Sequence, residues 1–299
     1  MKKIENILAL AFFGFLTACG GSDGDVASPE VPDYPENPKK AIQLSSRTVN
    51  GNFQNGDKIG VFVVNWKGGV AQNLQSSGNY VNNMCFTTQN AVWTPDAPIY
   101  WEGEQTVADF YGYSPYGKVT DAKAFPIAVM QQQTDEKSYE QSDFLWGKRV
   151  GEKASESVVN LTLDHMMSKA VIKVAAGDGF TDEEIDKANI SVSLCNLKSS
   201  GTIDLSNGQI TPQGATTALN ALKMNNHTFQ ALVLPQQVER TDLVQINYND
   251  NQFKLNRAMI FESQKEYTFT ITLTKNRGGI NVNVGSWDVV DTDFGGTVN

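Results

Sequence analysis

The sequence predicts an all-β fold of antiparallel β-sandwich type, and three observations lead to this expectation. Short runs of apolar, β-branched and aromatic residues recur along the chain and are broken by Gly, Asn, Asp and Pro, which are typical of turns. Several runs alternate apolar and polar residues, so one face of the strand is buried and the other is wet. No repeated succession of strand and helix patterns occurs, so a parallel α/β fold is not expected.

The individual elements follow from the same patterns. The first strand is entered through the turn Asn55-Gly56-Asp57, and the last three strands alternate strictly. One helix is expected at Thr181–Asp186, because Thr181 can act as the N-cap and acidic residues fill the first turn. The expected strands are Lys58–Val64, Thr106–Tyr113, Ala170–Val174, Ile190–Leu194, Tyr267–Leu273 and Ile280–Val284.

The N-terminal segment has the pattern of a lipoprotein signal peptide. Lys2 and Lys3 precede the apolar run Ile7–Leu16, which is shorter than the roughly 20 residues that span a bilayer. Small residues then lead to Cys19, the position that a lipobox cysteine occupies. We expect Cys19 to carry the lipid, since several acyl chains at ~0.8 kcal/mol per CH₂ anchor firmly. An ordinary secretory signal is the alternative.

The remaining chain is expected to divide into a tether and two strand-rich halves. The segment after Cys19 is acidic and Pro-rich, which favours an extended chain, and Ser22–Asp25 resembles the surface-export signal of Bacteroides-type lipoproteins. The polar segment Gly151–Ser157 separates the two halves. The expected parts are residues 1–18, a signal peptide; 19–40, the lipidated tether; 41–155, an N-terminal domain; and 156–299, a C-terminal domain.

Charge and cysteine content exclude several classes of protein. The net charge of −9 gives no electrostatic basis for holding nucleic acid, whose affinity comes from neutralised phosphates. Cys85 and Cys195 are 110 positions apart and have no CxxC partner. Two free thiols are therefore favoured over a disulfide.

Catalytic and metal sites are not expected, and neither is a cofactor. Asp164-His165 and Ser168 invite a hydrolase interpretation, but Ser168 does not stand in a GxSxG motif. His227 is the only other histidine, so a zinc site has too few ligands. Asp23-Gly24-Asp25 lacks the spacing of an EF-hand loop.

A group of aromatic residues in the first half has two interpretations. The rings could form an exposed platform on which sugars stack, or they could fill the sandwich core. Strand-like alternation favours the core. The residues are Trp93, Tyr100, Trp101, Tyr111, Tyr113 and Tyr116.

Several sequence segments, taken in their order along the chain, resemble those of one protein family. They include the segments Ser46–Thr48, Gly56–Phe62, Tyr100-Trp101, Asp109–Tyr116, Asp143–Gly147, Leu161–Lys169, Leu234–Gln236 and Lys265–Phe269, together with Trp93. The set is similar to the fimbrillin family, the subunits of Bacteroidales-type (type V) pili. The resemblance runs from about residue 45 to the C-terminus.

The resemblance implies both a fold and a mode of assembly. Fimbrillins have two transthyretin-like antiparallel β-sandwich domains in tandem and travel to the outer membrane as lipoprotein precursors. An Arg-specific protease then removes the N-terminal segment with its first strand, and a strand from a neighbouring subunit fills the groove. By match to this pattern, cleavage would fall between Arg47 and Thr48, and Ala41–Ser45 would be the lost strand.

The same resemblance implies the partners of the chain. The donor strand would come from the C-terminal segment, with Ile280, Val282, Val284 and Trp287 as candidates. The partners would be other fimbrial subunits, and the role would be cell adhesion as a shaft, anchor or tip subunit. The alternative is a monomeric surface lipoprotein that binds glycans through the exposed aromatic residues.

Overall fold

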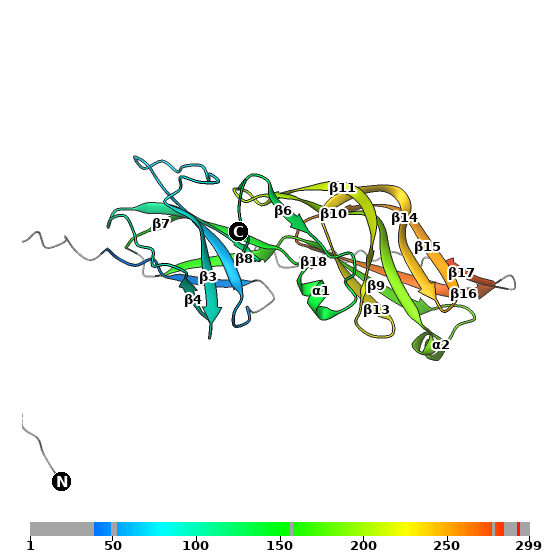
Figure 1. Ribbon diagram of the computed structural model, residues 1–299. Helices are drawn as coiled ribbons and strands as arrows, with labels where there is room; N and C mark the ends of the chain where they lie inside the picture. Colours follow the sequence, from blue (N-terminus) through cyan, green and yellow to red (C-terminus); the bar gives the residue numbers. More distant parts are fainter. Residues whose placement is uncertain (1–38, 49–52, 156–157, 277–278, 284–291, 294–299) are drawn as a thin grey trace, which may run out of the picture. The chain divides into compact units, whose positions relative to one another are not determined.

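The computed structural model describes residues 39–48, 53–155, 158–276, 279–283 and 292–293 (Figure 1). Residues from Lys39 onward form one compact unit. The expected signal peptide, Cys19, and the donor candidates Val284 and Trp287 lie outside the described residues. Within the described part, no helix has the length and apolar character needed to cross a membrane.

A seven-stranded sheet contains most of the first half of the unit. Its order is β1-β8-β7-β5-β2-β3-β4, and only the β1–β8 pair in it is parallel. Its strands are β1 (Leu44–Thr48), β2 (Lys58–Asn65), β3 (Val81–Gln89), β4 (Val92–Pro95), β5 (Val107–Ser114), β7 (Leu145–Lys153) and β8 (Val159–His165).

Two further sheets make up the second half. A five-stranded sheet has the order β11-β10-β14-β15, with β6 also paired to β10, and consists of β6 (Phe125–Ala128), β10 (Ile190–Asp204), β11 (Gln209–Asn220), β14 (Gln236–Tyr248) and β15 (Asn251–Phe261). A six-stranded sheet has the order β12-β13-β9-β16-β17, and β18 also pairs with β16. Its strands are β9 (Ser168–Ala176), β12 (Leu222–Lys223), β13 (Thr228–Val233), β16 (Lys265–Asn276), β17 (Gly279–Asn283) and β18 (Thr292–Asp293). Strands β9 and β16 are parallel.

Two apolar cores lie within these layers. The larger core is built mainly from the inward faces of the five- and six-stranded sheets, and Phe229, Phe261 and Phe269 are among its fully buried side chains. The smaller core belongs to the seven-stranded sheet and includes Phe86 and Phe110. The predicted all-β class is confirmed. In the seven-stranded sheet, the central strands β2 and β5 bury side chains on both faces, one face in each core.

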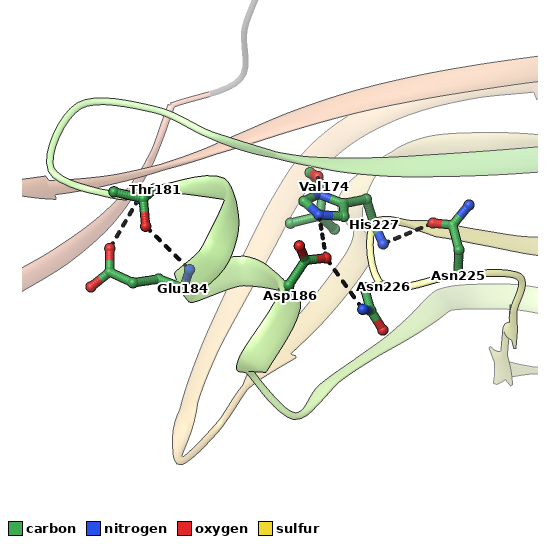
Figure 2. A network of polar contacts seen from close by, with 7 residues as sticks. All are labelled: Val174, Thr181, Glu184, Asp186, Asn225, Asn226 and His227. Atoms are coloured by element: carbon green, nitrogen blue, oxygen red, sulfur yellow. Dashed lines mark hydrogen bonds and ion pairs between the residues drawn. The ribbon is translucent and has the colours of Figure 1, made fainter.

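The predicted strands all overlap observed strands, and the predicted helix is present as α2 (Asp182–Lys187). Thr181 is its N-cap: the Thr181 hydroxyl accepts from the Glu184 N–H at 3.2 Å, and the Glu184 carboxylate accepts from the Thr181 N–H at 3.0 Å (Figure 2). A second short helix, α1 (Glu136–Glu140), was not predicted. Asp135 caps α1 in the same way, with Ser138 in place of the glutamate.

The expected domain boundary lies between two strands of one sheet. The segment Gly151–Ser157 begins with the last three residues of β7 and leads toward β8. Strands β7 and β8 pair with each other, and β8 also pairs with β1. The change of sheet comes between His165 and Ser168, and β6 from the first half joins the sheet of β10. The division of the unit into two domains, residues 41–155 and 156–299, stays a proposal.

The two described cysteines are free thiols, as expected. Cys85 is buried in β3 and Cys195 is half-buried in β10. Burial is the main cause that raises the pKa of each thiol above its ordinary value. A raised pKa lowers the fraction of each side chain that is present as the reactive thiolate.

Candidate functional site

The N-terminal segment from Lys40 to Thr48 is held by two successive ladders. In the first, the Ile42 N–H donates to the Ile99 carbonyl and the Trp101 N–H donates to the Lys40 carbonyl, both at 2.9 Å. In the second, β1 runs parallel to β8, from Leu44 opposite Val159 to Thr48 opposite Leu163. The segment is thus bonded on both sides by residues far away in the sequence.

These two ladders place the segment at a seam of the seven-stranded sheet. Strands β1 and β4 are at opposite ends of the sheet order, yet they lie in contact. The indole N–H of Trp93 in β4 donates to the Ser46 carbonyl in β1 at 3.1 Å, and Phe53 packs edge-on against the Trp93 ring at 4.9 Å. The sheet therefore curls, and the N-terminal segment closes it.

Side chains alternate along the segment. Ile42 and Leu44 point inward and are buried in the smaller core beside Trp93 and Trp101. Gln43, Ser45 and Arg47 are exposed. Burial of an Ile or Leu side chain contributes about 1.5–3 kcal/mol, so the two inward residues hold this segment in place.

Arg47 and Thr48 occupy the last two positions of β1. The exposed Arg47 side chain donates through Nε to the Thr162 hydroxyl at 3.3 Å. The half-buried Thr48 hydroxyl contacts His165 Nε2 at 3.3 Å, and His165 Nδ1 contacts the Asp143 carboxylate at 2.6 Å. The expected cleavage position is thus within a strand, with an accessible side chain and a hydrogen-bonded backbone.

Asp164, His165 and Ser168 are not arranged as the hydrolase interpretation requires. His165 contacts Asp143 and Thr48, while the Ser168 hydroxyl donates to the Glu262 carbonyl at 2.5 Å. In the described part of the chain, no group of three His, Cys, Asp or Glu side chains is placed to hold a metal ion.

The donor-strand candidates Ile280 and Val282 lie in β17, away from β1. They pair antiparallel with β16, Ile280 opposite Lys275 and Val282 opposite Leu273. Strand β18 pairs with the other end of β16. Strands β17 and β18 are therefore hydrogen-bonded within their own chain, in a different sheet from β1.

The aromatic group is divided between core and surface. Trp93, Trp101, Tyr111 and Tyr113 are buried, and burial raises the pKa of Tyr113 to about 12. Tyr100 is 42% exposed and Tyr116 is 40% exposed. Core packing is thus confirmed for four of the six residues, and the two tryptophans offer no exposed stacking platform.

Sequence reasoning missed the contacts that hold the segment. Thr48 and His165 are 117 positions apart, and Trp93 and Ser46 are 47 apart, so no local pattern links them. It also missed an ordered connection between β2 and β3, whose signal was a concentration of Asn and Gln at residues 72–83.

Comparison with protein-family models gives a match over most of the chain. A family model described as fimbrillin-like matches residues 46–287. A search of curated proteins found no match.

Solved structures share the fold of the chain. A proposed cell adhesion protein from Bacteroides uniformis has a TM-score of 0.63 at 20% identity, covering 84% of this chain and 97% of that one. A proposed cell adhesion protein from Bacteroides ovatus has a TM-score of 0.66 at 18% identity, covering 86% and 100%. A fimbrial protein from Bacteroides vulgatus has a TM-score of 0.54 at 13% identity, covering 82% and 98%.

Proposed function

Since this chain belongs to the fimbrillin-like family, whose members are non-enzymatic fimbrial adhesion subunits of the cell surface, we propose how it assembles. The chain is exported as a lipoprotein anchored at Cys19 in the outer membrane. Cleavage between Arg47 and Thr48 releases the N-terminal segment. A strand from a neighbouring subunit then takes its place.

The observation that carries this proposal is the position of the segment at the seam. Its loss would free the Trp101 and Val159 N–H groups and the Ile99 carbonyl, which now bond to the segment. It would also uncover the part of the smaller core that Ile42 and Leu44 now cover. An open edge beside an apolar groove is the feature that an added strand satisfies.

The donated strand would come from the C-terminal segment, with Ile280, Val282, Val284 and Trp287 as the residues that fill the groove. Ile280 and Val282 alternate with polar residues, as a strand with one buried face requires. For donation, β17 would have to leave β16, so assembly would exchange one set of backbone hydrogen bonds for another.

The test is digestion of the purified chain with an Arg-specific protease. The natural chain is compared with the Arg47→Lys variant. The matched control is Arg240→Lys, at an exposed position of β14. We expect N-terminal sequencing to find Thr48 and gels to show SDS-resistant ladders for the natural chain and the control. The Arg47→Lys variant should give neither a Thr48 N-terminus nor SDS-resistant ladders. Ladders that form equally well from Arg47→Lys would overturn the proposal, and so would a digest without a Thr48 terminus.

A further inference from the structure

A cavity of about 390 Å³ opens between the end of β2 and the start of β3. Residues 66–80 form most of its wall, and Glu102 from the connection before β5 completes it. Ligand cavities in proteins have volumes of about 300–1,000 Å³, so this one has room for a small ligand. Its polar lining includes Asn65, Gln72, Gln75, Asn79, Tyr80 and Glu102.

The wall of this cavity is held in one conformation by its own contacts. Leu74 is buried in the larger core and anchors the middle of the connection. The Asn79 amide donates to the Gln75 carbonyl at 2.7 Å and to Asn82 Oδ1 at 2.9 Å, while Asn79 Oδ1 accepts from the Gln75 N–H at 3.0 Å. The Ala122 N–H donates to the Ser76 hydroxyl at 2.9 Å. A ligand would therefore meet a wall that is already ordered.

The polar groups of the cavity leave hydrogen-bonding capacity for a ligand. Asn65 Nδ2 donates to Glu102 Oε2 at 2.7 Å, but Asn65 Oδ1 is buried and has no hydrogen-bond partner among the described residues. This oxygen is enclosed in the wall and does not face the cavity. The NH₂ groups of Gln72 and Gln75 donate to backbone carbonyls, while their Oε1 atoms make no hydrogen bond among the described residues. A ligand hydroxyl can donate to these two oxygens.

Tyr80 provides the apolar part of the site. Its hydroxyl donates to the Tyr100 carbonyl at 2.7 Å, which fixes the ring, and 38% of the residue is exposed. Burial, and then the charge of Glu102, raise the pKa of Tyr80, so the phenol stays neutral. The ring combines an apolar face with a fixed polar end.

The charges that line the cavity favour a neutral ligand. Lys67 and Glu102 contribute one charge of each sign, and the chain as a whole carries −9. Amide groups, one tyrosine ring and balanced charge suit a ligand with many hydroxyl groups and an apolar ring face. We propose that this cavity, which we call the Tyr80 pocket, binds a neutral pyranose sugar.

A larger cavity of about 460 Å³ serves as the internal comparison. It lies where β10 and β14 separate, beside Lys198 and Gln237, and no aromatic residue is among its described lining residues. Its amides are already used: the Gln236 side chain accepts from the Lys198 N–H at 2.9 Å and donates to the Lys198 carbonyl at 3.0 Å. It therefore lacks the aromatic ring of the Tyr80 pocket.

The experiment is saturation-transfer NMR of the intact chain with methyl glycosides of galactose, glucose, mannose and N-acetylglucosamine. We expect transfer to the ring protons of at least one of them. Tyr80→Ala and Gln72→Ala should each weaken binding about tenfold, the effect of losing about 1.4 kcal/mol of ring contact or hydrogen bonding. Gln237→Ala in the larger cavity should leave binding unchanged, and thermal unfolding should show that all variants are folded.

Two outcomes would overturn the proposal. One is that binding is absent or does not depend on the pocket. In that case no saturation is transferred to any of the four neutral glycosides, or both pocket variants bind as well as the natural chain. The other is stronger binding of glucuronate or N-acetylneuraminate than of the neutral sugars, since the balanced charges of Lys67 and Glu102 give a carboxylate no net attraction. The test uses the intact chain and requires neither cleavage at Arg47 nor polymerisation, so its failure can be told apart from a failure of the assembly proposal.

Discussion

At the scale of single residues, glutamine side chains replace backbone partners where strands end or diverge. Gln133 is fully buried, and its amide donates to the Leu232 carbonyl while its Oε1 accepts from the Leu232 N–H, both at 2.8 Å. Gln236 bonds to Lys198 in the same two-pronged way. One side chain thus satisfies both polar groups of a residue in the sheet.

This arrangement makes Gln133 a sensitive position. Gln133→Leu should lower the free energy of unfolding by about 3 kcal/mol, because the Leu232 N–H and carbonyl would be left buried without partners. Urea denaturation would measure the change. The control is Gln237→Leu on the exposed face of β14, which should change the free energy by less than about 0.5 kcal/mol. Equal effects of the two substitutions would contradict this account of Gln133.

At the scale of elements, α2 is attached to the sheets by polar contacts at both ends. Near its start, Lys275 in β16 contacts Glu184 at 2.6 Å and lies 4.2 Å from the Phe180 ring centroid. Near its end, Asp186 contacts His227 at 2.9 Å and Asn226 at 3.2 Å, just before β13 (Figure 2). The helix is too short to be stable alone, so these contacts and its buried Ile185 hold it.

The ion pair between Glu184 and Lys275 predicts that the stability of the protein depends on pH. The Lys275 ammonium, and then the Thr181 N–H, hold the pKa of Glu184 below its ordinary value. A depressed carboxyl pKa contributes stability that is complete above the ordinary pKa and is lost as the pH falls through the folded-state pKa. Lys275→Met should move the pKa of Glu184 upward and remove part of this acid sensitivity.

Carboxyl-detected NMR titration would measure this pKa directly. Asp242 is the control: Asn256 and Lys254 lower its pKa, and Lys275 takes no part. Lys275→Met should leave Asp242 unchanged. A Glu184 titration that the substitution does not alter would show that the ion pair is absent in solution.

The elements also show which features local patterns can predict. Alternation was enough to find strands such as β10 and β16, and the Thr181 cap was enough to find α2. Helix α1 was missed because it has only five residues and Ser138 stands where a glutamate would complete the usual capping signal. The parallel pairing of β1 with β8 was not predicted, since register between strands more than 100 positions apart has no local signature.

At the scale of the whole molecule, the seam makes the smaller core dependent on a short terminal segment. A chain beginning at Thr48 should unfold at a lower temperature than the full chain, because Ile42 and Leu44 no longer cover the core. A peptide of residues 39–48 should raise its unfolding temperature in a concentration-dependent manner, as a ligand of the folded state does. Scanning calorimetry would measure both effects.

The matched control is the same peptide with Ile42→Asp and Leu44→Asp. It should not restore stability, because two carboxylates cannot enter an apolar groove. If the chain beginning at Thr48 were as stable as the full chain, or if both peptides acted equally, the segment would not be the element that closes the sheet. A restored unfolding temperature would show that the groove accepts a strand from solution.

The residues from Ile99 to Trp101 contact both the N-terminal segment and the Tyr80 side chain. Their backbone bonds to the N-terminal segment on one side, and the Tyr100 carbonyl holds the Tyr80 hydroxyl on the other. Replacement of the segment by a strand from another subunit would therefore act on the wall of the Tyr80 pocket. Affinity for a sugar would then differ between a newly exported subunit and the same subunit within a filament, which would couple receptor binding to assembly.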